Sequence, residues 1–223
     1  MGTVLEMNVV VIANGEWDAN WGKKELSQKR YELLIAADGG ADYALAAGLV
    51  PDVLIGDLDS ISGESLSKCK QGHTLIKKYP REKDETDLEL ALSYAHSYLE
   101  KNGTPIDEIL LYAASGKRLD HLLGNIALMS GYALQKRRIR MICKDYQAWV
   151  LTQGKEQIAG KKGQQVSLIP LTDKARISSK GLYYELSDLT LSASSARGIS
   201  NVFLGQTAEI EVHEGKALVV LLT

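Results

Sequence analysis

The sequence predicts an α/β protein: an N-terminal, mostly parallel sheet flanked by helices, followed by a C-terminal all-β domain. Strand and helix patterns alternate over the first two thirds of the 223 residues, which is typical of a parallel sheet with helices on both faces. Near Asp145 the pattern changes to short β-like segments separated by turns such as Lys162-Gly163 and Glu214-Gly215. We therefore expect two domains, residues 1–145 and 146–223.

The elements of the first domain follow from its apolar runs and helix signals. Val9-Val10-Val11-Ile12 is a buried-strand pattern, and Gly48 is placed to end the short helix that precedes Pro51. Residues 86–101 carry apolar side chains at helical spacing, and Thr86-Asp87-Leu88-Glu89 fits a capping box. The predicted strands are 9–12, 33–37, 53–55, 75–79, 109–113 and 139–143, and the predicted helices are 41–47, 62–70, 86–101 and 119–134.

The second domain is expected to be a small sandwich or barrel. Its segments are short and β-like, and glycine-containing turns separate them. The predicted strands are 148–152, 165–169, 189–192, 208–212 and 217–222.

Composition narrows the function classes. The formal net charge of −2, from 26 basic and 28 acidic side chains, offers no basic face for nucleic acid. No apolar run is long enough to span a membrane, and the N-terminus lacks the pattern of a signal peptide. Cys69 and Cys143 form no Cys-x-x-Cys motif, so neither a disulfide framework nor a zinc knuckle is indicated. We expect a cytoplasmic protein with neither nucleic-acid nor membrane partners.

The segment Gly56-Asp57-Leu58-Asp59-Ser60-Ile61 directly follows the predicted strand 53–55. In an extended chain, residues two apart point the same way, so Asp57 and Asp59 would present their carboxylates together. Ligands of open α/β sheets bind at the carboxyl ends of the strands. Magnesium prefers a few carboxylates together with water and substrate phosphates. The segment therefore predicts a metal-assisted phosphate site, although Asp-x-Asp alone is also common in solvated turns.

Three other strand-to-helix junctions carry polar or glycine-rich chemistry. Asp38-Gly39-Gly40 would let backbone approach a phosphate or sugar, although a plain tight turn explains it equally well. In Lys83-Asp84-Glu85-Thr86-Asp87 the acids suit the first turn of a helix, but the lysine and the second acid exceed what capping requires. Ser115-Gly116-Lys117-Arg118 places cations at a helix start, where the helix dipole disfavours them, and this conflict is what a phosphate site would produce.

The sequence lacks several common enzyme motifs. There is no Walker P-loop, no Gly-x-Gly-x-x-Gly and no Gly-x-Ser-x-Gly, and the four histidines are scattered. After these motifs are excluded, the pattern left is a carboxylate-rich site, of the kind that binds magnesium, beside basic residues. That combination suits phosphoryl or diphosphoryl transfer from a nucleotide, where catalysis is mostly positioning and charge neutralisation. The residues alone leave the acceptor open.

The ordered set of motifs resembles the thiamine pyrophosphokinase family, especially its bacterial form. The order and spacing of the motifs follow the family over nearly the whole chain. The matching segments are Asp38-Gly39-Gly40-Ala41, Pro51-Asp52, Ile55-Gly56-Asp57-Leu58-Asp59-Ser60-Ile61, Lys83-Asp84-Glu85-Thr86-Asp87, Gly116-Lys117-Arg118-Leu119-Asp120-His121 with Asn125-Ile126, Ser179-Lys180-Gly181-Leu182-Tyr183-Tyr184, and Ser200-Asn201.

The resemblance implies transfer of the diphosphoryl group of ATP to the hydroxyl of thiamine, with Mg²⁺ as cofactor. It also implies a Rossmann-like nucleotide domain, a C-terminal β-sandwich, and a homodimer with active sites between subunits. Asp57, Asp59 and Asp84 would hold magnesium, and Asp59 or Asp84 would serve as the base. The residues that would surround ATP are Asp38, Gly39, Gly40, Lys83, Thr86, Asp87, Arg118, Asp120, His121 and Asn125.

Arg118 would neutralise charge on the transferring group, which makes it the fourth catalytic candidate after the three aspartates, and Lys83 would assist. Ser200 and Asn201 would bind the aminopyrimidine of thiamine. Tyr184 would pack on its rings, where many relatives carry tryptophan. The alternatives are the same chemistry on another heteroaromatic alcohol such as a hydroxymethylpterin, a non-catalytic nucleotide or thiamine sensor, and a magnesium-dependent phosphohydrolase.

Overall fold

The computed structural model describes residues 8–102, 108–116, 118–135 and 138–223. They fall into two compact units: the residues up to Leu128 together with Met141–Lys144, and Met129–Arg140 together with Asp145–Thr223. Strand β6 (Ile139–Ile142) contains residues of both units. The predicted domain boundary after residue 145 stays a prediction. No helix in the described ranges is long and apolar enough to cross a membrane.

The first unit is built on five parallel strands in the order β4-β3-β2-β1-β5. Val10 of β1 lies opposite Leu34 of β2 on one side and Leu110 of β5 on the other. Chain order runs outward from β1 to β4 and then resumes at β5 beside β1, so the sheet has its topological switch point between β1 and β5. The elements are β1 (Asn8–Ile12), α1 (Ala19–Ser27), β2 (Tyr31–Ala37), α2 (Gly40–Ala46), β3 (Val53–Gly56), α3 (Gly63–Gln71), β4 (Leu75–Lys78), α4 (Asp87–Asn102) and β5 (Ile109–Tyr112). Helix α5 (Leu119–Leu134) follows, and its residues up to Leu128 belong to this unit.

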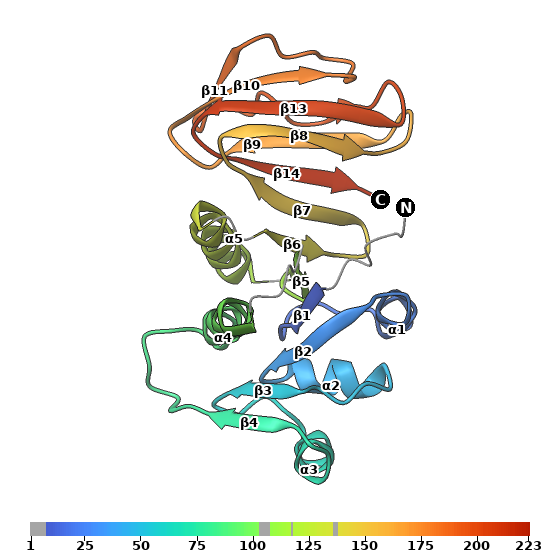
Figure 1. Ribbon diagram of the computed structural model, residues 1–223, viewed down its shortest axis with the longest axis vertical. Helices are drawn as coiled ribbons and strands as arrows, with labels where there is room; N and C mark the ends of the chain where they lie inside the picture. Colours follow the sequence, from blue (N-terminus) through green and yellow to red (C-terminus); the bar gives the residue numbers. More distant parts are fainter. Residues whose placement is uncertain (1–7, 103–107, 117, 136–137) are drawn as a thin grey trace. The chain divides into compact units, whose positions relative to one another are not determined.

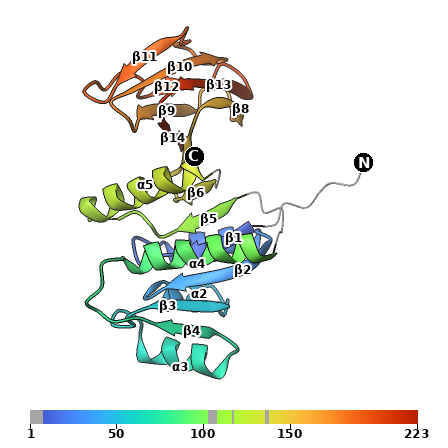
Figure 2. The same ribbon diagram turned by 60° about the vertical axis from the view of Figure 1, so that its left-hand side comes forward.

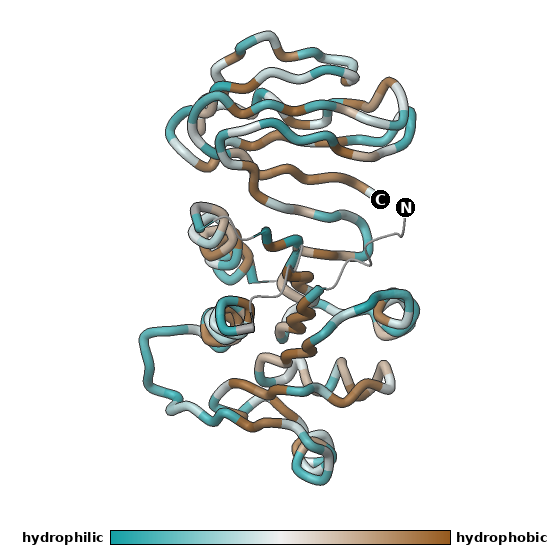
Figure 3. The backbone as a smooth tube through the Cα atoms, in the orientation of Figure 1, coloured by the Kyte–Doolittle hydropathy of each residue, from teal (hydrophilic) through white to brown (hydrophobic). Residues whose placement is uncertain are grey.

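Helices cover both faces of this sheet, as the strand–helix alternation predicted. Helices α1, α2 and α3 lie on one face and α4 on the other (Figures 1 and 2). Hydrophobic residues concentrate on the central strands (Figure 3), where Val10, Leu34 and Tyr112 are fully buried or nearly so. The predicted apolar face of α4 is confirmed, because its helically spaced members are all buried: Leu88, Ala91, Leu92, Ala95 and Leu99.

Helix α1 was not predicted, because its segment Ala19–Ser27 is polar and contains Gly22. Local contacts explain it. Asp18 caps the helix by accepting a hydrogen bond from the Trp21 backbone N–H at 2.9 Å. The ring of Trp17 covers Gly22 so closely that a Cβ there would lie 2.0 Å from the ring, which accounts for a glycine inside the helix.

In the second unit, the antiparallel strands β12-β9-β14-β7 form part of one sheet, and β11-β10-β13-β8 form a separate antiparallel sheet. Side chains from both sheets form one core, which includes Trp149, Val166, Ile177, Ile210 and Val219. The unit is therefore a β-sandwich. Its strands are β7 (Tyr146–Leu151), β8 (Gly154–Ala159), β9 (Gln165–Pro170), β10 (Lys174–Lys180), β11 (Leu189–Ser192), β12 (Asn201–Val202), β13 (Thr207–Glu214) and β14 (Ala217–Leu222).

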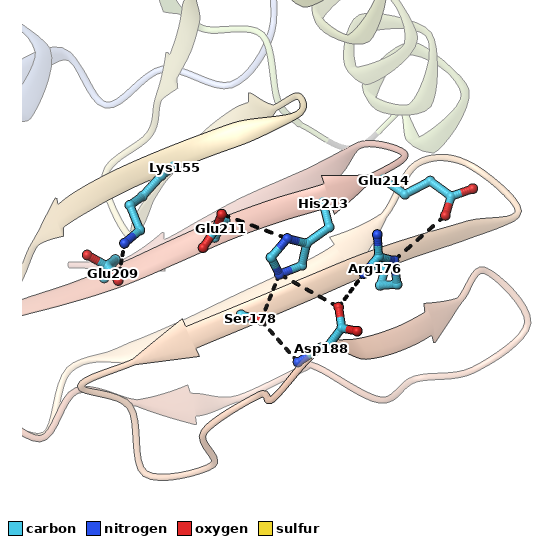
Figure 4. A network of polar contacts seen from close by, with 8 residues as sticks. All are labelled: Lys155, Arg176, Ser178, Asp188, Glu209, Glu211, His213 and Glu214. Atoms are coloured by element: carbon cyan, nitrogen blue, oxygen red, sulfur yellow. Dashed lines mark hydrogen bonds and ion pairs between the residues drawn. The ribbon is translucent and has the colours of Figure 1, made fainter.

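Strands β8 and β10 were not predicted, because most of their side chains are polar and belong to the outer face of the sandwich. Figure 4 shows this face over β10 and β13. Ser178 Oγ lies 2.8 Å from His213 Nε2 and accepts the Asp188 backbone N–H at 3.0 Å. Arg176 pairs with Asp188 at 2.5 Å, and Lys155 pairs with Glu209 of the neighbouring strand at 2.8 Å. Cross-strand pairs of this kind stabilise a solvated sheet face.

Candidate active site

A cavity of about 780 Å³ opens at the carboxyl ends of strands β1, β2 and β5, and all of the described residues that line it belong to the first unit. This is the position expected for a ligand in an open α/β sheet. Nine of the predicted site residues line it: Asp38, Asp59, Lys83, Thr86, Asp87, Arg118, Asp120, His121 and Asn125.

Three carboxylates gather at the β2–β3 end of this edge. Asp38, Asp57 and Asp59 each offer an oxygen within 4.8 Å of the other two, and they are respectively buried, half-buried and exposed. Asp57 and Asp59 are adjacent as predicted, but the chain between them is not extended. Leu58 has a φ of +66°, and the Asp59 backbone N–H donates to Asp57 Oδ1 at 3.2 Å. The left-handed conformation of Leu58 turns its side chain into a core cluster and keeps the two acids together.

Asp38 is the buried member of this acidic cluster, with only 3% of its surface exposed. Its Oδ2 accepts the Ser60 backbone N–H at 3.2 Å, whereas Oδ1 is buried with no hydrogen-bond partner in the described part of the chain. Burial raises the pKa of Asp38; the hydrogen bond from Ser60 opposes this rise, and the negative charges of Asp87 and Asp57 add to it. Such a carboxylate is costly unless a cation or a proton joins it.

The backbone is shaped to permit this crowding. Gly56 has a φ of +151°, and a Cβ there would lie 3.0 Å from the Asp38 Cβ and 3.1 Å from the Asp87 Cγ. Asp38 itself has a φ of +46°, a left-handed conformation that aspartate tolerates better than most residues. A side chain at position 56 would therefore separate the two acids.

The 83–87 segment contributes one cation to the cavity. Lys83 Nζ lies 3.0 Å from Asp87 Oδ1 and donates to the Pro80 carbonyl at 3.1 Å. Thr86 Oγ1 accepts the Glu89 backbone N–H at 3.1 Å, as the capping box predicted. Asp84 is exposed and belongs neither to the acidic cluster nor to the cavity wall. The acidic cluster of the described residues therefore contains Asp38 but not Asp84, and the role of Asp84 as a magnesium ligand stays a prediction.

The segment before α5 holds its cation in a local ion pair. Arg118 donates from Nε and Nη2 to the two carboxylate oxygens of Asp120, at 2.9 and 2.6 Å. The hydrogen bonds from Arg118 lower the pKa of Asp120, and this pairing offsets the unfavourable position of a cation at a helix start. Asn125 donates to the Ala114 carbonyl at 2.7 Å and so supports the same segment from within α5. Lys117 lies outside the described residues.

Gly39 and Gly40 do not line the cavity. A Cβ on Gly40 would lie 2.1 Å from the Ile12 carbonyl oxygen, and one on Gly39 would lie 2.4 Å from Asn14 Oδ1. These glycines therefore let the start of α2 approach the end of β1, so the close approach they permit is between parts of the protein itself.

The predicted substrate residues Tyr184, Ser200 and Asn201 belong to the second unit. Tyr184 is 64% exposed, and its ring meets that of Tyr183 edge-on at 4.9 Å. Asn201 is buried; its amide accepts the Tyr184 N–H at 3.0 Å and donates to the Tyr184 carbonyl at 2.7 Å. Ser200 has a φ of +58°, and its N–H donates to Ser167 Oγ. Asn201 therefore clamps the backbone that presents the Tyr184 ring.

The sequence reasoning did not single out several residues that line the cavity. Among them are Asn14, Gly15 and Glu16 after β1, and Ser115 after β5. The only signal was their place, directly after a strand on either side of the topological switch point. Asn14-Gly15 alone is indistinguishable from an ordinary turn.

Comparisons with known proteins agree with the motif set. Residues 25–143 match the family model for the thiamin pyrophosphokinase catalytic domain, and residues 152–217 match the model for the thiamin pyrophosphokinase vitamin B1 binding domain. The chain belongs to the thiamin pyrophosphokinase family. The predicted resemblance and the α/β fold with a C-terminal β domain are thereby confirmed.

Individual relatives extend this similarity over most of the chain. Thiamine pyrophosphokinase of Bacillus subtilis is 29% identical over 195 residues, covering 86% of this chain and 88% of its own. The crystal structure of the Bacillus subtilis thiamine pyrophosphokinase superposes with a TM-score of 0.83 at 26% identity, covering 98% of this chain and 99% of that one. The structure from Geobacillus thermodenitrificans gives a TM-score of 0.80 at 26% identity, covering 97% of each chain.

Proposed function

We propose that this protein is an enzyme that transfers the diphosphoryl group of ATP to the hydroxyl of thiamine, giving thiamine diphosphate and AMP. Family membership over both parts of the chain supports this reaction. The structural observation that carries it is the buried, partnerless Oδ1 of Asp38, which lies among carboxylates at the edge of a 780 Å³ cavity. That arrangement suits a cation-bound polyphosphate.

The alternatives are not favoured. A hydroxymethylpterin diphosphokinase would share the catalytic half, but residues 152–217 match a vitamin B1 binding domain. A sensor without catalysis is not favoured, because residues 25–143 match the model of a catalytic domain. A phosphohydrolase leaves the match of the second unit unexplained.

The chemistry of the donor set fits Mg²⁺, because every member of the acidic cluster offers carboxylate oxygen. Asp57 and Asp59 would hold the ion, with Asp38 or Asp84 as a further ligand. When bound, the cation supplies charge neutralisation for the ATP phosphates. The buried Oδ1 of Asp38 supports the choice of Asp38, and the exposed position of Asp84 suits a group that reaches the site only with substrate.

The reaction itself is a displacement at phosphorus. The thiamine hydroxyl oxygen forms a bond to the β-phosphorus of ATP, and the bond from that phosphorus to the α–β bridging oxygen breaks, releasing AMP. The hydroxyl proton passes to a carboxylate, either Asp59 or Asp84. Arg118 would exchange its partner Asp120 for the transferring group, and Lys83 would neutralise a second phosphate. His121, Thr86 and Asp87 complete the nucleotide site.

Thiamine would be bound through Tyr184, Ser200 and Asn201, with Asn201 holding the Tyr184 backbone in place. We also propose that the enzyme is a cytoplasmic homodimer with active sites between subunits. Leu119 and Leu123 of α5 are 65% and 58% exposed, and large exposed apolar side chains at helical spacing are typical of an interaction surface.

The test is product analysis after incubating the purified protein with ATP, Mg²⁺ and thiamine. The expected result is AMP formed in a one-to-one ratio with thiamine diphosphate. ADP as the co-product would indicate a monophosphoryl kinase, and free phosphate would indicate a hydrolase. Either result would overturn the proposed function.

A further inference from the structure

The cavity has two chemically different ends. The acidic cluster follows β2 and β3, whereas the other end lies between the segments that follow β1 and β5. If the acidic end holds the metal-bound phosphates of ATP, the nucleoside occupies the β1–β5 end. The cavity wall also includes apolar side chains suited to a flat base, those of Ala114 after β5 and of Leu122 and Leu128 on α5.

Glu16 is placed at this nucleoside end by a rigid segment. Its backbone N–H donates to the Ser115 carbonyl at 2.6 Å, and the preceding Gly15 N–H donates to the Ala113 carbonyl at 2.7 Å. The Tyr43 hydroxyl donates to the Gly15 carbonyl at 3.0 Å from the other side. These bonds continue the β1–β5 pairing beyond the strands and fix the direction from which the Glu16 side chain enters the cavity wall.

The carboxylate of Glu16 has no hydrogen bond or ion pair in the described part of the chain. The two described cations of the cavity wall are already paired, Lys83 with Asp87 and Arg118 with Asp120. An ionised carboxylate only accepts hydrogen bonds, and it repels phosphate. The ligand group that suits Glu16 is therefore a neutral donor. ATP offers its ribose hydroxyls and the amino group of adenine, and comparison with dATP, which keeps the amino group, tests the hydroxyls.

We infer that Glu16 recognises the ribose hydroxyls of the nucleotide and makes the enzyme selective for ribonucleotides over 2′-deoxyribonucleotides. This inference rests on the proposed function, because it takes the orientation of ATP from the acidic cluster. Glu16 then accepts hydrogen bonds from the 2′- and 3′-hydroxyls, and the rigid backbone at Gly15 limits its freedom to move toward other groups.

The experiment measures the dissociation constants of Mg²⁺-ATP and Mg²⁺-dATP by isothermal titration calorimetry, without thiamine. We expect the unmodified protein to bind ATP about tenfold more tightly than dATP, which corresponds to about 1.4 kcal/mol, the scale of a hydrogen bond to a charged group. Glu16→Ala should reduce the ratio to about twofold or less, chiefly by weakening ATP binding, and Glu16→Gln should keep part of it because the amide oxygen still accepts. Glu64→Ala, the same change on α3 outside the cavity wall, should keep the full ratio.

Equal binding of ATP and dATP by the unmodified protein would overturn the inference, as would an undiminished ratio in Glu16→Ala. These outcomes are distinct from failure of the proposed function. Discrimination that depends on Glu16, in a protein that forms no thiamine diphosphate, would refute the reaction and leave the ribose contact standing.

Discussion

Replacing Asp38 by asparagine should stabilise the metal-free protein while abolishing its activity. Asp38 is buried, its Oδ1 lacks a partner in the described chain, and Asp57 and Asp87 repel its charge. Asparagine removes that charge, keeps an oxygen for the Ser60 N–H, and offers N–H donors toward the neighbouring carboxylates. Asparagine also tolerates the left-handed backbone at this position, where φ is +46°.

The magnitude follows from the cost of a buried polar group without a partner, about 1–3 kcal/mol. For a chain of this length, each kcal/mol shifts the melting temperature by about 2–4 °C. Asp38→Asn should therefore raise the melting temperature in EDTA at pH 7.5 by roughly 2–12 °C. Transfer activity should fall to background, because the cluster loses one of its three carboxylates.

The stabilisation by Asp38→Asn should depend on pH, and the pKa of Asp38 gives the direction of that dependence. The folded-state pKa of Asp38 is raised above the ordinary value of 3.8, so the folded protein binds more protons than the unfolded chain between the two values. Above the folded-state pKa, the ionised Asp38 carboxylate destabilises the folded protein by its full amount. This destabilisation disappears as the pH falls below 3.8. The advantage of Asp38→Asn over the unmodified protein should therefore shrink at acidic pH.

Asp42 on α2 provides a matched control, for which the expected change in melting temperature has the opposite sign. Burial opposes its ionisation, but hydrogen bonds from Ser62 and Ser65 outweigh this and lower its pKa. Its carboxylate accepts the Ser62 hydroxyl at 2.6 Å and the Ser62 N–H at 3.1 Å. Asp42→Asn should lower the melting temperature. An unchanged or lower melting temperature for Asp38→Asn in EDTA would refute the reasoning about the buried carboxylate.

Four further substitutions and one control test other parts of the site. Asp57→Asn and Asp84→Asn should each abolish transfer without unfolding the protein; near-normal turnover in both would contradict the metal-site assignment, and activity in Asp84→Asn alone would favour Asp38 as the third ligand. Tyr184→Ala, which removes an exposed ring, should raise the Michaelis constant for thiamine more than that for ATP, and an unchanged thiamine constant would remove Tyr184 from the site. Tyr43→Phe should raise the Michaelis constant for ATP about fivefold with little change in kcat, because it removes one hydrogen bond of about 1 kcal/mol to the segment after β1. Tyr98→Phe is the control: it loses an exposed hydrogen bond to Glu32 and should leave the Michaelis constant for ATP unchanged.

Local sequence predicted most of the first unit. The bounds of α5, Leu119–Leu134, are those predicted, and the buried face of α4 is the predicted one, because both follow from side-chain spacing along one element. Helix α1 and strands β8 and β10 escaped prediction because their own residues are polar. Helix α1 is stabilised by the Trp17 ring, which precedes it in the chain and packs on Gly22, and β8 and β10 are stabilised by pairing with β13.

The candidate site, like the fold, combines features that the sequence predicts with features that only the structure shows. The sequence by itself determined the residue types, the order of the motifs and the family, because these are properties of the chain read in one dimension. Tertiary structure decided that Asp38 joins Asp57 and Asp59 and that Glu16 lines the same cavity. Sheet order brings the ends of β1, β2, β3 and β5 to one edge, and burial there raises the pKa of Asp38. Neither strand order nor burial can be read from any single segment.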